Sequence, residues 1–125
     1  MAPEHRLGGK RILLVEDDYP IARAMGREFA TYGAEILGPA ATVRDSLALI
    51  QSQSFDAAVL DINLRGDSVY PVADALAARG IPFVFATGYD RTIVPERFSG
   101  RPCCEKPVGA AELTDALFGS AVQSS

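Results

Sequence analysis

Two short apolar runs of the sequence end in acidic residues. Residues 57–60 lead into Asp61, and residues 12–15 lead into Glu16, Asp17 and Asp18. Each run has the length and composition of a buried strand, so each would carry carboxylates to the carboxyl end of a strand. If the two strands are neighbours in a parallel sheet, up to four carboxylates converge on one pocket. Their repulsion is tolerable only with a divalent cation or with raised pKa values, and this combination points to chemistry on phosphate.

Size and composition limit the classes of protein to consider. A chain of 125 residues with 48% hydrophobic and 22% charged residues suits one soluble domain with its own core. The net charge of −4 argues against direct binding to nucleic acid. No apolar stretch is long enough to cross a bilayer, and residues 1–10 lack the apolar region of a signal peptide, so we expect a cytoplasmic protein with no membrane partner.

Five apolar runs alternate with segments of helical periodicity, which is typical of βα repetition. We expect strands at residues 12–15, 35–38, 55–60, 81–86 and 101–105. These units predict an α/β fold: a doubly wound (βα)5 three-layer sandwich around a flavodoxin-like parallel sheet of strand order 2-1-3-4-5. In such a fold the ligand site lies beyond the carboxyl ends of the strands.

The segments between the strands carry helix signals. Ile21, Met25 and Phe29 mark one face of a first helix, and Gly33 follows as a stop signal. Thr42, with Asp45 three residues later, resembles a capping box at the start of a second helix. Two further helices are expected at residues 69–78 and 110–118, whereas residues 90–100 contain a proline and a poor apolar stripe, so we expect a short or mobile helix there.

Two other strands end in residues that suit phosphate chemistry. Thr87 and Gly88 follow the fourth strand, and Lys106 and Pro107 follow the fifth. An acidic cluster alone would bind a cation, with hydrated Mg²⁺ favoured. A lysine and a hydroxyl beside that cluster could hold phosphoryl oxygens, which leaves a carboxylate as the attacking nucleophile.

Four stretches together resemble the receiver domains of two-component response regulators, namely residues 13–18, 59–64, 85–88 and 105–107. The resemblance covers residues 10–119, with tails at 1–9 and 120–125. It implies that Asp61 accepts a phosphoryl group from a phosphohistidine on a sensor histidine kinase or on a histidine phosphotransfer protein. It also implies a phosphoacceptor signalling domain that catalyses only its own phosphorylation and dephosphorylation, rather than an enzyme.

The resemblance also assigns roles to individual residues. Asp17 and Asp61 would bind Mg²⁺ directly together with the backbone carbonyl of Asn63, and Glu16 would act mainly through water. In the active state Thr87 would bond one phosphoryl oxygen.

Lys106 would pair with another phosphoryl oxygen. The peptide bond between Lys106 and Pro107 is typically cis in such domains, which would aim the lysine into the pocket.

The motif Phe85-Ala86-Thr87-Gly88-Tyr89 resembles more narrowly the FAT GUY receivers, which are often linked to HWE-type histidine kinases. Most receivers have Tyr or Phe three residues before the lysine, but this chain has Cys103 there, so the usual aromatic switch is missing. We hypothesise that Tyr89 takes over part of the signalling. The expected output is a change at the face formed by residues 90–100, 101–105 and 110–118, where a downstream protein could bind.

Several alternatives remain open. A haloacid dehalogenase-type phosphatase also uses a strand-end aspartate, but it needs a second Asp two residues later, where this chain has Asn63. A flavodoxin-like electron carrier would need a phosphate-binding first loop, which Glu16, Asp17 and Asp18 would oppose. Within the receiver interpretation, the chain could be a stand-alone regulator, a module of a hybrid kinase, or a phosphate sink without output.

Overall fold

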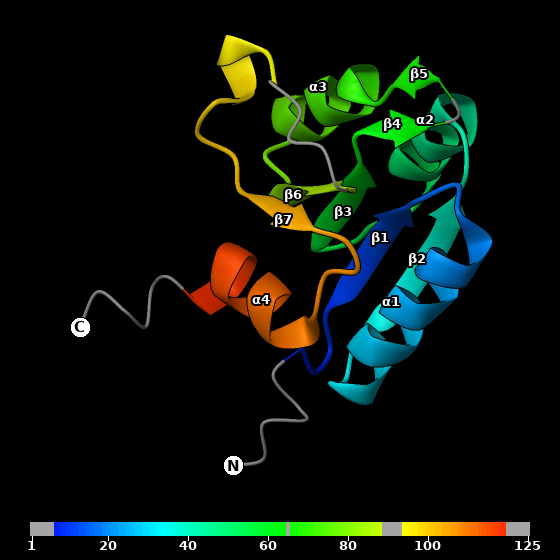
Figure 1. Cartoon of the computed structure of the whole chain (residues 1–125), viewed down its shortest axis with the longest axis vertical. Helices are drawn as coiled ribbons and strands as arrows, with labels where there is room; N and C mark the ends of the chain where they lie inside the picture. The colour runs from blue at the N-terminus through cyan, green and yellow to red at the C-terminus, as the bar shows by residue number, and fades with distance from the viewer. Residues whose placement is uncertain (1–6, 65, 89–93, 120–125) are drawn as a thin grey trace.

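A five-stranded parallel sheet forms the centre of the computed structural model, which describes residues 7–64, 66–88 and 94–119 (Figure 1). The strand order is β2-β1-β3-β6-β7. The bounds are β1 Arg11–Val15, β2 Glu35–Ala40, β3 Ala57–Asp61, β6 Phe83–Thr87 and β7 Cys103–Glu105. The short strands β4 and β5 form a separate hairpin. When only the five strands of the main sheet are numbered along the chain, their order is 2-1-3-4-5, so the predicted flavodoxin-like α/β fold is confirmed.

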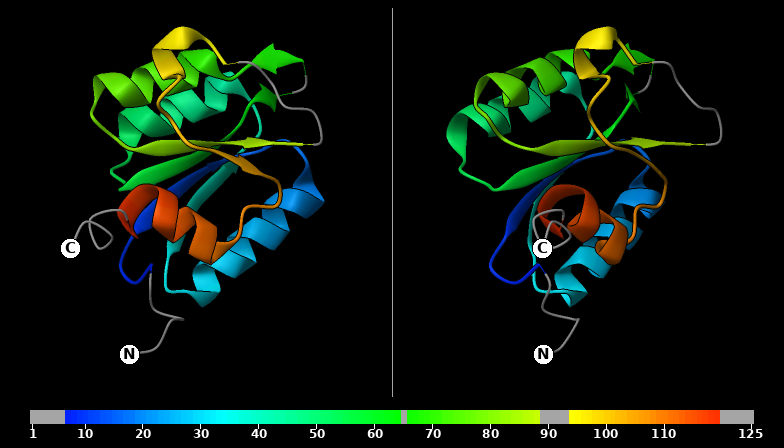
Figure 2. Two further views of the ribbon diagram at one scale, coloured as in Figure 1. Left: turned by 60° about the vertical axis from the view of Figure 1, so that its left-hand side comes forward. Right: turned by 90° about the vertical axis from the view of Figure 1, so that its left-hand side faces the viewer.

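Helices cover both faces of the sheet (Figure 2). On one face lie α1 (Tyr19–Thr31) and α4 (Ala110–Thr114), and on the other lie α2 (Val43–Ser52) and α3 (Tyr70–Ala78). Each face packs its own apolar layer, because the side chains of β1, β3 and β6 alternate between the two layers. The closing helix, expected over residues 110–118, is α-helical only to Thr114 and continues as the π-helix η3 (Asp115–Gly119).

Local sequence signals explain where the first two helices begin. The Asp18 side chain accepts a hydrogen bond from the Ile21 N–H at the start of α1. The Thr42 hydroxyl accepts one from the Asp45 N–H at the start of α2, as the three-residue spacing predicts. The helix α1 ends before Gly33, whose φ of 99° lies in the left-handed region that glycine adopts easily.

The structure differs from the sequence prediction at several element boundaries. The strands β3 and β6 start two residues later than predicted and end one residue later, so Asp61 and Thr87 are themselves the last residues of their strands. A small antiparallel hairpin of β4 (Asn63–Leu64) and β5 (Asp67–Ser68) was not predicted, because two-residue strands carry no periodic pattern.

The predicted fourth helix corresponds only to a short 3₁₀ turn in the described residues. This turn, η2, spans Glu96–Phe98, and Pro95 precedes it. Residues 89–93, and Tyr89 with them, lie outside the described part of the chain. Within the described residues, no helix is long and apolar enough to cross a membrane.

One residue of the predicted N-terminal tail belongs to the core. Leu7 is fully buried beside α1 and the sheet, and its N–H donates a 2.8 Å hydrogen bond to the Tyr32 carbonyl. The packed structure therefore begins before Lys10.

We predict that Leu7→Ala lowers the free energy of unfolding by about 2–5 kcal/mol, because the change leaves a cavity in a packed layer. Chemical denaturation measures this loss. Leu49→Ala is the matched control, because Leu49 on α2 is only partly buried and should cost less. A loss for Leu7→Ala no larger than that for Leu49→Ala would show that residue 7 does not contribute to the core.

Candidate functional site

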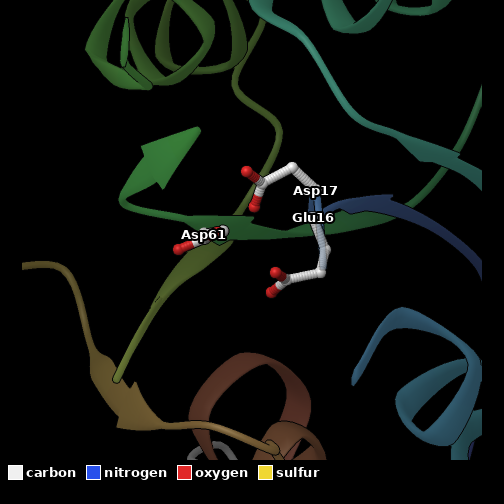
Figure 3. Close-up of side chains that lie close together, drawn as sticks. All are labelled: Glu16, Asp17 and Asp61. Atoms are coloured by element: carbon white, nitrogen blue, oxygen red, sulfur yellow. The ribbon is translucent and has the colours of Figure 1, made fainter. Parts of the chain in front are cut away.

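Three carboxylates from two adjacent strands converge on one space. The strands β1 and β3 pair in parallel with Val15 opposite Leu60, so Glu16 and Asp61 leave the sheet at the same edge. Figure 3 shows Glu16 and Asp17 reaching from the end of β1 toward Asp61 at the end of β3. One oxygen of each carboxylate lies within 4.8 Å of the others. The sequence prediction that acids from two strands meet is therefore confirmed for these three residues.

Asp18, the fourth acid of the predicted cluster, caps a helix instead of joining the other three carboxylates. The Asp18 carboxylate caps α1 through the Ile21 N–H, at 3.2 Å from it. Its backbone N–H donates a 3.0 Å hydrogen bond to Glu16 Oε2. The sequence does not predict this backbone contribution, because any residue type except proline could supply the same N–H.

The two central carboxylates are almost completely withdrawn from solvent. Glu16 is 2% exposed and Asp61 is 5% exposed, whereas Asp17 is half-buried. Burial of two like charges side by side is strongly unfavourable unless a counter-charge or a proton compensates for it. This constraint determines the role of the nearest lysine.

Lys106 provides the counter-charge. Its Nζ lies 3.3 Å from Glu16 Oε2 and 3.4 Å from Asp61 Oδ1, so one ammonium group bridges both carboxylates. The Lys106 N–H donates a 2.7 Å hydrogen bond to the Thr87 carbonyl, which ties the residue after β7 to the end of β6. The Lys106–Pro107 peptide bond is cis.

The bridging lysine does not fully compensate for burial. Burial raises the pKa of Asp61 to about 7, and the Glu16 carboxylate adds to the increase, while Lys106 and the Asn63 N–H oppose it. Burial lowers the pKa of Lys106, but the carboxylates of Asp61 and Glu16 outweigh that effect and raise it above its ordinary value. Lys106 therefore stays charged, whereas Asp61 changes its protonation state near neutral pH.

The donor set fits a hydrated divalent cation. Glu16 Oε1 is buried and has no hydrogen-bond partner among the described residues, so it can still accept a bond from a metal-bound water. Three carboxylate oxygens close to one another are the ligand type that Mg²⁺ and Ca²⁺ prefer, and a cation would offset their repulsion. The cluster could therefore bind a metal.

The other predicted site residues lie along the same edge. Thr87 is half-buried at the end of β6, next to β7, and its hydroxyl lies 3.5 Å from the Gly88 carbonyl. Asn63 contacts Asp61 through its backbone N–H, which donates a 3.3 Å hydrogen bond to Oδ1. Cys103 opens β7 opposite Phe85 and is exposed.

The fold resembles solved structures of response regulator proteins. SdrG from Sphingomonas melonis Fr1 is 40% identical, with 86% of this chain and 92% of that chain covered and a TM-score of 0.70. A CheY-like response regulator receiver domain protein from Methanospirillum hungatei JF-1 is 27% identical, with coverages of 92% and 91% and a TM-score of 0.71.

A Burkholderia pseudomallei response regulator, crystallised with a phosphorylated aspartic acid, a calcium ion and citrate, shares the fold at a TM-score of 0.74. It is 21% identical, with 92% of this chain and 71% of that chain covered. No protein-family model matches the sequence, and no curated protein matches it.

The raised pKa of Asp61 predicts how stability depends on pH without metal. Between pH 3.8 and about 7 the folded chain keeps a proton on Asp61 that the unfolded chain has lost. The free energy of unfolding should therefore fall as the pH rises through this range. At pH 8, Asp61→Asn should be more stable than the wild type by about 2 kcal/mol, because it removes a buried charge.

Thermal or urea unfolding in a chelator measures the difference, with Asp67→Asn as the control because Asp67 is exposed. Added Mg²⁺ should stabilise the wild type and Asp67→Asn but not Asp61→Asn. If Asp61→Asn is less stable than the wild type at pH 8 without metal, the carboxylate cluster is not under electrostatic strain.

Proposed function

The chain belongs to the family of CheY-like response regulator receiver domains, and we propose that it accepts a phosphoryl group on Asp61 from a phosphohistidine of a partner kinase or phosphotransfer protein. The observation that carries this proposal is the Lys106 bridge between Asp61 and Glu16 at the end of the sheet. This bridge supports the proposal because it holds a fixed positive charge, Lys106, next to the buried carboxylate of Asp61, which would be the nucleophile.

In the proposed reaction an Asp61 carboxylate oxygen attacks the phosphorus in line. A P–O bond forms as the P–N bond to the imidazole breaks, and the leaving imidazole nitrogen takes up a proton from water. The Lys106 ammonium, within 3.4 Å of Asp61 Oδ1, neutralises charge on the transferring oxygens. Attack requires the deprotonated form of Asp61, and Lys106 favours that form because it lowers the pKa that burial and Glu16 raise.

We propose Mg²⁺ as the cation of this site. Asp17, Asp61 and the backbone carbonyl of Asn63 would hold it directly, and Glu16 would act mainly through water. When bound, the ion supplies positive charge that offsets the carboxylates and the phosphoryl oxygens. Glu16 Oε1 suits the water-mediated role because it is buried without a protein donor.

The signalling step that we propose starts at Thr87. Its hydroxyl would bond a phosphoryl oxygen, and the end of β6 would move toward the modified Asp61. A downstream protein would then respond at the face formed by residues 94–100, β7 and α4. Phosphorylation replaces the single negative charge of a carboxylate by about 1.5–2 negative charges and adds three acceptor oxygens, which is enough to bias a two-state equilibrium.

The sequence motif that includes the end of β6 supports a more specific proposal for the partner. Phe85, Ala86 and Thr87 complete this strand, and with Gly88 and Tyr89 they support assignment to the FAT GUY receivers. We therefore propose an HWE-type histidine kinase as the phosphodonor. Signalling through Tyr89 remains part of the proposal, and that residue lies outside the described part of the chain.

Replacing the acceptor tests the assignment directly. Asp61→Asn should abolish base-labile labelling by a radioactive phosphodonor such as acetyl phosphate, because the amide oxygen is a poor nucleophile, and a chelator should abolish labelling of the wild type. Asp67→Asn is the control, because the same substitution at an exposed position nearby should leave labelling intact. Labelling that survives in Asp61→Asn would refute the proposal.

Lys106→Met should slow phosphorylation by about 100-fold, because the fixed positive charge at the transferring oxygens is lost. Rapid-mixing measurements at pH 8 and saturating Mg²⁺ isolate this step from the protonation of Asp61. The only other lysine of the sequence, Lys10, supplies the control, and Lys10→Met should keep the wild-type rate. Equal rates in the two variants would remove Lys106 from the mechanism.

A further inference from the structure

A continuous series of contacts connects Asp61 to the start of α3. The Asn63 N–H is hydrogen-bonded to Asp61 Oδ1, and Asn63 pairs with Ser68 across the β4–β5 hairpin. The Ser68 hydroxyl accepts a 3.1 Å hydrogen bond from the N–H of Tyr70, which is the first residue of α3. A shift of the atoms around Asp61 therefore has a short physical route to Tyr70.

The Tyr70 ring lies between β6 and η2 and contacts a phenylalanine of each. It stacks on Phe98 at a centroid distance of 5.7 Å and an interplanar angle of 24°. It also meets Phe85 edge-on at 5.9 Å and 83°. Phe85 lies two residues before Thr87 on β6, so both side chains project from the same face of the strand. Tyr70 thus contacts both the strand that ends in Thr87 and the buried side chain of η2.

The remaining contacts of η2 hold it against α3 and β6, and Figures 1 and 2 show it beside α3. Phe98 is 2% exposed and meets Phe85 edge-on at 5.6 Å. Arg97 forms two hydrogen bonds of 2.9 and 3.0 Å with Asp74 on α3. This ion pair is exposed on both sides, so it contributes little to holding the turn. Among the described residues, the aromatic contacts are therefore the main connection of η2 to α3 and β6.

We propose that Tyr70 is a positioning residue that couples phosphorylation of Asp61 to the conformation of residues 94–101. The proposal rests on the phosphoacceptor function proposed above. A phosphoryl group on Asp61 competes for the Asn63 N–H, and the hairpin and Tyr70 move with it. Aromatic pairs favour offset-stacked or edge-on geometries, so a displaced Tyr70 ring would weaken its stacked contact with Phe98 or exchange it for another geometry.

NMR amide shifts measured with Mg²⁺ before and after adding beryllofluoride, a phosphoryl mimic that attaches to a carboxylate, test the coupling. In the wild type the amides of Asn63 and Lys106 should shift together with those of Phe98 and Arg101. In Tyr70→Leu the first pair should still shift, whereas the response of the second pair should be lost. Tyr70→Phe should restore it, because both ring contacts are made without the hydroxyl.

Tyr32→Leu is the matched control, since Tyr32 packs in the layer on the opposite side of the sheet and the change should leave both responses intact. Ser68→Ala is a milder second variant, which keeps the Tyr70 ring and removes only the hydroxyl that accepts the Tyr70 N–H. Because Ser68 is exposed, the fold should tolerate this change. It should reduce the response at Phe98 and Arg101.

An undiminished response at Phe98 and Arg101 in Tyr70→Leu would overturn the coupling role. If Tyr70→Leu does not fold, an undiminished response in Ser68→Ala would overturn it instead. If the wild-type amides of Asn63 and Lys106 do not respond at all, the proposed phosphoacceptor function fails and the coupling fails with it. The two failures are therefore distinguishable in one data set.

Discussion

The site depends on the ion bridge that one lysine makes between two buried carboxylates. Glu16 and Asp61 are both nearly inaccessible to water, and Lys106 lies within 3.4 Å of an oxygen of each. Without this ammonium group the pair would carry two uncompensated charges, which costs several kcal/mol in a protein interior. With it, one carboxylate still has a strongly raised pKa. This partial compensation leaves a need for further positive charge, which a cation can meet.

Sheet topology brings these residues together. The strands β1, β3, β6 and β7 are neighbours and run in parallel, so their carboxyl ends place Glu16, Asp61, Thr87 and Lys106 along one edge. The apolar layers on both faces fix the strands, and hydrogen bonds at the edge fix the residues that follow them. The aromatic contacts of Tyr70 lie directly beside this edge, on the face covered by α2 and α3. The same packing that buries Asp61 thus offers a route by which the proposed phosphorylation would reach η2.

Much of this arrangement could be predicted from the sequence, because it depends on local patterns. Apolar runs that end in acids, a threonine or a lysine identify both the strands and the edge, and the Thr42 cap follows from spacing alone. The remaining features depend on contacts between distant segments. Leu7 looks like part of a polar tail until α1 and the sheet cover it. Asp18 could not be assigned to helix capping rather than to the acidic cluster, because the same residue type suits both. The stacking of Tyr70 on Phe98 joins residues from two elements and has no signature in either.

The site depends most on the electrostatic balance at Asp61, which carbon-13 NMR titration of its carboxyl group measures directly in metal-free protein. We expect an apparent pKa of about 7 in the wild type. The pKa should fall in Glu16→Gln, which removes the repelling charge, and rise in Lys106→Met, which removes the compensating one. A wild-type pKa near the ordinary aspartate value of 3.8, unchanged in both variants, would show that Glu16 and Lys106 do not set the charge of Asp61.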